Sequence, residues 1–479
     1  MIILGTNSIK DTGFNVANSL RFNSGSSDNL SRTKGTSDST TKGTYSFWFK
    51  LSKTTGLTLI ENGTAAADRA IVYIASDSTL KIFSKIGNST KLDLNPNRVF
   101  RDTSAWYHLV IAIDTTDGTA GDRVKVYVNG VRETSFATAT YPDQNDALRF
   151  FTSSEIEEIG IDFENGGLFD GYMCEVVKVD GSQLAPTSFG EFDEDSGIWK
   201  PIDVSGLTFG TNGFYLEFKE SGTSQNASGL GADTSGNTNH FAVNNLTAID
   251  QSTDTCTNNF ATLNPLALRN NPSAYYVTFS DGNLKLVGND ATNNGNAFST
   301  IGFNSGKWYC EVKVLSVEGS LYPIIGVITE NSISNGSGNN GIIGQVTSDT
   351  VGYANDGEKV IAGTESSYGD TYTDNDIIGI AIDCDNGAVY FSKNGTFQAS
   401  GNPTSGASKT NAAMTFTAGA NYFFGVSAYK STSDVEFNFG SPPYAISSGN
   451  TDGNGYGNFE YAVPSGYYAL NTKNLAEYG

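Results

Sequence analysis

Short runs of alternating apolar and polar residues, each ending at glycine, asparagine or aspartate, recur along the chain. The clearest is the stretch 376–395, which reads DIIGIAIDCDNGAVYFSKNG. Asn386-Gly387 at its centre suits the positive φ angles of a type I′ turn, so the stretch predicts a β-hairpin with a two-residue loop. Because side chains alternate between the two faces of a strand, we expect one buried face to carry Ile378, Ile380, Ile382, Cys384, Val389 and Phe391.

The same period of two residues predicts strands at 19–23, 44–50, 104–114 and 123–131, and Asn129-Gly130 forms a second predicted hairpin turn. No long segment has helical periodicity. The 479 residues are enough for about two to four domains of ordinary size. We therefore predict an all-β protein made of two antiparallel β-sandwiches joined by an extended connector.

Net charge and cysteine content limit the classes of function that this chain can have. The formal net charge is −22, which argues against nucleic acid as a partner because phosphate neutralisation needs a basic face. No apolar stretch is long enough for membrane insertion, and Met1-Ile2-Ile3-Leu4 is too short for a signal-peptide core. The four cysteines lie far apart without zinc-ligand spacing, so we expect buried free thiols.

The region around the first hairpin resembles the SPRY domain. The motifs that carry this resemblance are GKWYCEV (306–312), VGYANDG (351–357), the hairpin itself, YFFGVS (422–427) and FNFG (437–440). Their order and spacing fit the family. The resemblance implies a SPRY-like β-sandwich at 273–445 that binds partners through its loops. It also implies a tail, 446–479, that packs on this sandwich or on a neighbouring chain.

The first part of the chain resembles the laminin-G-like, concanavalin-type jelly roll. The landmarks are SLRFN (19–23), the strand 104–114, the hairpin 123–131 and FDGYMCEV (169–176). They place a jelly roll at 1–200. The Gly-, Ser- and Asn-rich connector, 201–272, is expected to form ordered arms and short strands, because long structureless stretches are rare in compact proteins.

A narrower resemblance follows the jelly roll. SFGEF (188–192), GIWKP (197–201) and GTNGFYL (210–216) resemble the continuation found in virion structural proteins of marine tailed bacteriophages. This implies a virion protein made in the host cytoplasm, in contact with other virion proteins and with host-surface polysaccharide or another receptor, and assembled as a homo-oligomer. Ile2-Ile3-Leu4 is a candidate docking segment.

Loops in which aromatic residues stand beside Asn and Asp are the predicted contact sites. Such loops can hold sugars by ring stacking and by hydrogen bonds to hydroxyls. The alternative is that the aromatic rings plug the ends of the sandwiches. The candidates are Tyr141, Asp143, Asn145, Tyr353, Asn355, Asp356, Tyr368, Asp370 and Tyr372.

A Ca²⁺ ion is possible in the jelly roll, since late loops there supply many oxygen ligands. The same residue types also simply form turns, and no ligand set is singled out. The residues concerned are Asp143, Asn145, Asp146, Asp162, Glu164, Asn165 and Asp170.

No catalytic residue is predicted. Glycanases on concanavalin-type folds set two carboxylates across the sugar, but the nearest acid pattern, Glu191 to Ser196, has serine where its last acid is needed. The acids Glu155, Glu157 and Glu158 have the wrong spacing and are expected to be structural or to face water. His108 is expected to be a hydrogen-bonded residue within the sandwich, and His240 has no visible partner.

Three functions remain after these arguments. The first is a phage appendage protein (tail fibre, tail-tip piece or head fibre) that attaches to host glycan without catalysis. The second is a purely structural decoration or scaffold protein of the virion. The third is a glycanase that acts on host polysaccharide.

Overall fold

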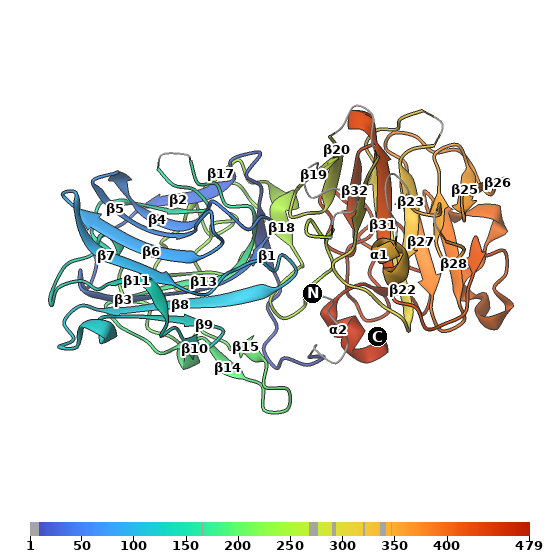
Figure 1. Cartoon of the computed structure of the whole chain (residues 1–479). Helices are drawn as coiled ribbons and strands as arrows, with labels where there is room; N and C mark the ends of the chain where they lie inside the picture. The colour runs from blue at the N-terminus through green and yellow to red at the C-terminus, as the bar shows by residue number, and fades with distance from the viewer. Residues whose placement is uncertain are drawn as a thin grey trace. The chain divides into compact units, whose positions relative to one another are not determined.

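The computed structural model describes residues 9–163, 166–267, 276–289, 294–319, 321–335, 342–345 and 347–479. The chain divides into two compact units. The N-terminal unit spans Thr12–Thr257, and the C-terminal unit comprises Asn258–Gly479 with the described residues up to Asp11. Both units are built almost wholly of antiparallel strands (Figure 1), as the alternating pattern predicts.

Two eight-stranded sheets form the N-terminal unit (Figure 1). The first has the order β10-β9-β8-β3-β13-β1-β18, with β16 paired to β13, and the second the order β11-β7-β6-β5-β4-β12-β2-β17. The strands of the first sheet are β1 (Ser19–Phe22), β3 (Lys42–Leu51), β8 (Trp106–Asp114), β9 (Val124–Val128), β10 (Val131–Arg132), β13 (Gly171–Asp180), β16 (Phe214–Leu216) and β18 (Gln251–Ser252). Those of the second are β2 (Asn29–Thr33), β4 (Leu57–Ala65), β5 (Asp68–Ile74), β6 (Leu80–Ile86), β7 (Ser89–Pro96), β11 (Phe136–Thr140), β12 (Ile156–Ile159) and β17 (Ala242–Asn244).

The core of this unit lies between the two sheets. On β8, Leu109, Ile111 and Ile113 point into it, as the alternation predicts. The β9–β10 turn is the predicted two-residue turn: Val128 pairs with Val131, and Asn129 and Gly130 have φ angles of 48° and 77°. A side chain at Gly130 would meet the ring of Trp199 at 2.4 Å, so this turn requires glycine for space as well as for conformation.

Residues 201–257 belong to the N-terminal unit. β16 pairs with β13, β17 with β2 and β18 with β1. These short strands extend both sheets by backbone hydrogen bonds. The unit therefore ends at Thr257, beyond residue 200, where the sequence places the end of the jelly roll. The expected start of the second sandwich, residue 273, lies outside the described residues.

A nine-stranded and a six-stranded sheet form the C-terminal unit (Figure 1). The larger has the order β19-β20-β32-β22-β27-β28-β29, with β30 paired to β28 and β33 to β22; the smaller is β21-β31-β23-β24-β25-β26. The larger sheet comprises β19 (Val277–Ser280), β20 (Lys285–Gly288), β22 (Lys307–Val314), β27 (Ile377–Asp383), β28 (Ala388–Lys393), β29 (Thr396–Phe397), β30 (Met414–Thr415), β32 (Val435–Asn438) and β33 (Tyr468–Ala469). The smaller comprises β21 (Asn294–Phe298), β23 (Ile324–Thr329), β24 (Val351–Tyr353), β25 (Glu358–Ile361), β26 (Thr364–Ser367) and β31 (Tyr422–Tyr429).

Helices are short in both units. The remaining elements are the hairpin β14 (Gly190–Phe192) with β15 (Trp199–Pro201), α1 (Glu330–Asn335), α2 (Thr472–Tyr478), and the 3₁₀ turns η2 (Ala120–Asp122), η3 (Arg149–Phe151), η4 (Pro186–Ser188), η5 (Ala248–Asp250), η6 (Gln398–Ser400), η7 (Pro403–Ser408) and η8 (Lys430–Thr432). Among the described residues, no helix combines the length and apolar character that crossing a bilayer requires. The four cysteines are free thiols; Cys174, Cys310 and Cys384 are buried as predicted, whereas Cys256 is half-buried.

The β27–β28 hairpin has the predicted faces but a different turn. Asp383 pairs with Ala388, so four residues connect the strands instead of two. The Asp383 carboxylate accepts the Asn386 backbone N–H at 2.9 Å and its amide at 2.8 Å, and only Gly387 of this turn has a positive φ. The register shifts by two residues, so the predicted apolar side chains still share the core.

Glu311 on β22 holds the C-terminal tail against the larger sheet. Its carboxylate accepts the backbone N–H groups of Glu460 at 2.9 Å and Tyr461 at 2.8 Å, together with the Tyr309 hydroxyl at 3.2 Å. Burial raises the pKa of Glu311 to about 7. Farther along the tail, β33 pairs with β22.

Glu311→Gln is expected to loosen this tail. The Gln side chain has one acceptor oxygen, so its NH₂ group must face donors that the carboxylate now accepts. The expected cost is about 1–3 kcal/mol. Limited proteolysis, read by mass spectrometry, should show faster cleavage within 446–479. Asp374→Asn, which changes an exposed acid of the same unit outside the tail, is the control; equal cleavage rates in both variants would contradict the anchoring role.

Candidate functional site

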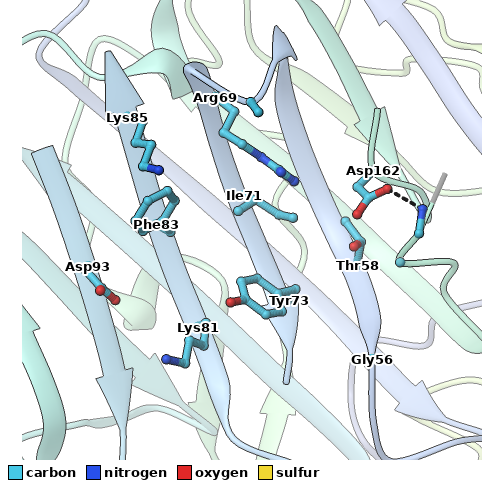
Figure 2. A pocket seen from close by; sticks show the side chains of 13 residues that line it. Gly56, Thr58, Arg69, Ile71, Tyr73, Lys81, Phe83, Lys85, Asp93 and Asp162 are labelled. Atoms are coloured by element: carbon cyan, nitrogen blue, oxygen red, sulfur yellow. Dashed lines mark hydrogen bonds between the residues drawn. The ribbon is translucent and has the colours of Figure 1, made fainter. Parts of the chain in front are cut away.

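A hollow of about 500 Å³ lies on the outer face of β4–β7, on the side of the sheet away from the core (Figure 2). We call it the β4–β7 hollow. Its lining residues are Gly56, Thr58, Ala66, Arg69, Ile71, Tyr73, Lys81, Phe83, Lys85, Asp93, Asp162, Gly166 and Gly167. None of them, apart from Asp162, is among the residues singled out from the sequence.

The period of two residues builds this face. On β5, Ala70, Val72 and Ile74 enter the core, so Arg69, Ile71 and Tyr73 line the hollow. On β6, Leu80 and Ile82 enter the core while Lys81, Phe83 and Lys85 line the hollow. The two strings DRAIVYI and LKIFSKI carry this alternation plainly. An aromatic residue between charged ones on the solvent side is the signal from which the site could have been found.

The rings of Tyr73 and Phe83 form the apolar part of the hollow. Both side chains are half-buried, and Figure 2 shows them on neighbouring strands, with the side chain of Ile71 close by. A partly exposed aromatic ring offers a flat apolar surface with little conformational entropy to lose on binding. Such a surface suits the C–H-rich face of a sugar ring.

Four polar groups around these rings are uncommitted. Within the part of the chain that the structure describes, no hydrogen bond or ion pair engages the side chains of Tyr73, Lys81, Lys85 or Asp93. The Lys85 ammonium lies 5.4 Å from the centre of the Phe83 ring. Nearby charges outside the hollow are paired, for example Lys91 with Asp146 at 3.2 Å. The hollow thus combines an apolar platform with free donors and acceptors, as small-molecule sites do.

Arg69 has a different role because it is already engaged. Its Nε lies 2.7 Å from the Glu61 carboxylate, and its guanidinium lies 4.8 Å from the centre of the Phe163 ring. Burial raises the pKa of Glu61 to about 7 despite this neighbour. Glu61 pairs in register with Glu158 on β12, and burial and the Asp162 charge raise the pKa of Glu158 as well. Glu61 is fully buried, so it can orient Arg69 but cannot contact a ligand.

The three predicted tyrosines of the SPRY-like loops are not surface residues, and their prediction as exposed contact residues is wrong. Tyr353, Tyr368 and Tyr372 are buried in the core. Tyr353 packs against Tyr368, Tyr372 and Phe391 with ring centres 5.2–5.6 Å apart. Their hydroxyls bond to backbone: Tyr353 to Asp370 O, and Tyr372 to Pro323 O and Tyr353 O. These rings plug the sandwich.

The other predicted contact residues are scattered. Asn355 is buried and donates to Gly319 O at 3.0 Å, whereas Asp356 is half-buried and Asp370 exposed. In the jelly roll, Tyr141 packs partly on the core while Asp143 and Asn145 are exposed. None of them lines the β4–β7 hollow.

The candidate calcium ligands do not converge in the described part of the chain. No three His, Cys, Asp or Glu side chains there are grouped in the way a metal ion requires. Asp170 pairs with Lys53 at 2.9 Å, Asp146 with Lys91, and Asp162 accepts the Gly166 N–H at 2.8 Å. Glu164 and Asn165 lie outside the described residues.

His108 is buried and hydrogen-bonded, as the sequence predicts, but it lies on the face of β8 opposite the core between the sheets, stacked on Trp48 and Trp199. Its Nδ1 accepts from Trp199 Nε1 at 2.9 Å, and its Nε2 lies 2.8 Å from Ser46 Oγ. Because Nδ1 accepts, the neutral ring carries its proton on Nε2 and donates to the serine. It therefore cannot take a proton from Ser46, although a Ser–His pair is present. Burial lowers the pKa of His108 to about 3.

The acids near β14 have a structural arrangement. Asp193 accepts from the backbone and hydroxyl of Ser196, and Lys200 lies 3.2 Å from Asp193 and 3.5 Å from Glu191. The Ser196 bonds and Lys200 lower the pKa of Asp193 to about 2, which does not suit a general acid. His240 accepts the Asp233 N–H on Nδ1 at 2.9 Å.

Comparison with known proteins identifies the two modules. Residues 24–181 match the family model of the concanavalin A-like lectin/glucanases superfamily, and residues 307–442 match that of the SPRY domain. No curated protein matches the sequence at a significant level.

Solved structures similar to parts of this chain include three of note. The SPRY domain of human HERC1 has 18% identity and a TM-score of 0.28, over 36% of this chain and 96% of that one. The native heptameric SAP-like pentraxin from Limulus polyphemus has 15% identity and a TM-score of 0.26, over 36% and 80%. Domain 4 of AbnA, a GH43 extracellular arabinanase from Geobacillus stearothermophilus, in complex with arabinotriose, has 19% identity and a TM-score of 0.24, over 33% and 68%. The two family matches, on the strand orders described above, show that this chain contains a concanavalin A-like domain followed by a SPRY domain.

Proposed function

We propose that this protein attaches to glycans through the β4–β7 hollow, and that it acts by binding and not by catalysis. One observation carries the proposal: Tyr73 and Phe83 present half-buried rings beside uncommitted polar groups. Ring stacking with hydrogen bonds to hydroxyls is the chemistry that shallow sugar sites use. Concanavalin A-like folds are compatible with this role.

We propose more specifically that the protein belongs to the virion of a tailed phage, as part of a tail fibre, tail tip or head fibre. The resemblance of 188–192, 197–201 and 210–216 to phage structural proteins supports it. A homo-oligomer displayed in many copies would raise the avidity of a weak sugar site by roughly 10²–10⁴ without new contacts. The SPRY domain would then contact other virion proteins.

Phe83→Ala is expected to weaken glycan binding at least about tenfold, because the variant removes the stacking surface while the backbone of β6 stays. Tyr73→Ala should act in the same direction. The measurement is binding of multimeric protein to intact host cells and to a polysaccharide array. Tyr127→Ala, which changes a half-buried aromatic residue on β9 in the other sheet, is the control and should bind like the parent protein.

Two results would contradict the proposal. If the multimeric parent protein binds no glycan or cell, the attachment role fails. If subunit-resolution imaging of the particle shows the β4–β7 hollow covered by another virion protein, the scaffold function replaces it. Absence of the protein from purified particles would remove the virion assignment but leave glycan binding standing.

A further inference from the structure

Two lysines flank Phe83 along β6. Lys81 and Lys85 lie four residues apart on the same face, one on each side of the ring (Figure 2). At about 3.3 Å per residue this separates their Cα atoms by roughly 13 Å. Their flexible stems let the ammonium groups approach the same ligand from two sides. Neither ammonium forms an ion pair in the described part of the chain. The Lys81 charge adds to the Thr79 hydrogen bonds that lower the pKa of Asp77.

This absence of partners is unexpected in so acidic a protein. The chain has 51 acidic and 29 basic residues, so carboxylates to pair with are plentiful. Of the other charges that line the hollow, Arg69 is engaged by Glu61, and Asp162 accepts the Gly166 N–H. Asp162 keeps its negative charge, but it lies beside Thr58 and not beside Phe83 (Figure 2). Around Phe83, the described charges without an ion-pair partner are Lys81, Lys85 and Asp93. A net negative protein repels an acidic polymer in general, so binding one requires such a local excess of cations.

We infer that the β4–β7 hollow takes an acidic glycan, one whose carboxylate or sulfate groups contact Lys81 and Lys85 while a sugar ring stacks on Phe83. The inference rests on the proposed glycan-binding function and narrows its ligand. Ammonium-to-carboxylate hydrogen bonds are stronger than neutral ones. In an open hollow they are also screened by salt, so binding should weaken as ionic strength rises.

Asp93 provides a separate test of the inference because its charge is opposite to that of the lysines. It pairs in register with Phe83, and so lies beside the ring, at a level between the two lysines. Its carboxylate accepts hydrogen bonds from sugar hydroxyls but repels an acidic substituent. Asp93→Asn keeps one acceptor oxygen and removes the charge. The ratio of affinity for acidic over neutral glycan should therefore rise in this variant.

The test is an array on which each acidic polysaccharide is printed beside its carboxyl-reduced or desulfated form. The parent protein should bind acidic members at least tenfold more tightly than their neutral forms at low salt, and this preference should shrink between 50 and 500 mM NaCl. Lys81→Gln with Lys85→Gln should abolish the preference, and Asp93→Asn should enlarge it. Lys125→Gln, which removes a lysine near Asp122 on the other sheet, is the control for net charge and should leave it unchanged. Thermal unfolding of each variant checks that the fold is intact.

The outcomes separate this inference from the proposed function. Equal or tighter binding of the neutral forms, with no effect of the lysine variants, overturns the acidic ligand and leaves glycan binding in place. Binding that survives Phe83→Ala unchanged, or no binding to any member, overturns the proposed function and the inference with it.

Discussion

Glu157→Gln is expected to destabilise the N-terminal unit by about 3–5 kcal/mol, the range measured when one partner is removed from a buried ion pair. Glu157 lies on β12 and is fully buried between the sheets. Its Oε2 is 2.6 Å from Arg32 Nη2, and its Oε1 is 3.0 Å from Lys178 Nζ and accepts the Tyr45 hydroxyl. Arg32 and Lys178 are buried as well.

The size of the effect comes from an excess of buried cations. Lys34 is a third buried cation beside this carboxylate, hydrogen-bonded to Asn62 Oδ1 at 2.8 Å. Burial alone would raise the pKa of Glu157, but Lys178, Arg32 and Lys34 outweigh it and hold that pKa at about 2. Burial lowers the pKa values of both lysines. Loss of the carboxylate would leave this cluster with positive charge only, deep in a low-dielectric interior.

Urea unfolding followed by tryptophan fluorescence measures this effect in a Trp308→Phe background, where all remaining tryptophans belong to the N-terminal unit. Lys178→Met in the Glu157→Gln protein should recover part of the loss, because it removes a cation that the first change left unpaired. Glu191→Gln, an exposed acid of the same unit, should stay within about 0.5 kcal/mol of the parent. A loss below about 1 kcal/mol for Glu157→Gln would show that the carboxylate does not hold the cluster together.

The same residue shows where sequence patterns stop being informative. β12 reads IEEI, which does not say which face is buried. The acids of this run are expected to be structural or to face water, and Glu157 takes the structural role: it is buried, whereas Ile156 on the other face is 37% exposed. Arg32, Lys34 and Lys178 are distant in sequence, so no local pattern reveals the partners that make this burial possible.

Longer, regular strands were predictable. The strand at 104–114 needs only alternation and the Asn129-Gly130 turn needs only two positive-φ positions, and both occur as predicted. The length of the Asn386-Gly387 turn was not predictable, because the side chain of Asp383 closes a longer loop through hydrogen bonds. Local propensity identifies a turn more reliably than its length.

The candidate site does not follow from aromatic residues in loops. Loop aromatics such as Tyr372 fill the end of a sandwich, where burial of a large ring is favourable. The β4–β7 hollow is instead formed by strand residues whose side chains face solvent. In the sequence these are the residues that alternate with the buried apolar ones. Which charges remain unpaired there depends on the whole fold.

A second large effect is expected in the acid stability of the N-terminal unit, through His108. The ring is buried and its pKa lies near 3, against 6.5 for the ordinary side chain. Above pH 6.5 the ring is neutral in both folded and unfolded states, so stability does not depend on its titration. As the pH falls from 6.5 to 3, the unfolded chain binds a proton that the folded unit does not. Stability is then lost at up to 1.36 kcal/mol per pH unit, in total about 4–5 kcal/mol.

Other buried groups change the pH dependence of the parent protein's stability in the opposite direction. Burial raises the pKa values of Glu61 and Glu175 to about 7, so between pH 7 and 4.5 the folded state binds their protons more tightly than the unfolded chain, and stability rises as the pH falls. The parent curve alone therefore cannot show the histidine effect. In the difference in stability between the parent protein and His108→Gln, the contributions of these acids cancel. Glu157 lowers stability mainly between about pH 4.5, where the unfolded side chain takes up its proton, and about pH 2, where the folded one does.

His108→Gln should be less stable than the parent at pH 7.5, because it disturbs the bonds to Ser46 and Trp199. That difference should shrink by about 2–3 kcal/mol between pH 6.5 and 4.5, since only the parent loses stability through the ring. Ser46→Ala is the matched control: it removes one hydrogen bond but keeps the buried imidazole, so its difference from the parent should stay nearly constant over the same range. Urea unfolding at pH 7.5, 6.5, 5.5 and 4.5 measures both differences. If the His108→Gln difference is also constant, the imidazole takes up a proton in the folded unit, and the hydrogen bond from Trp199 Nε1 to its Nδ1 cannot persist in acid.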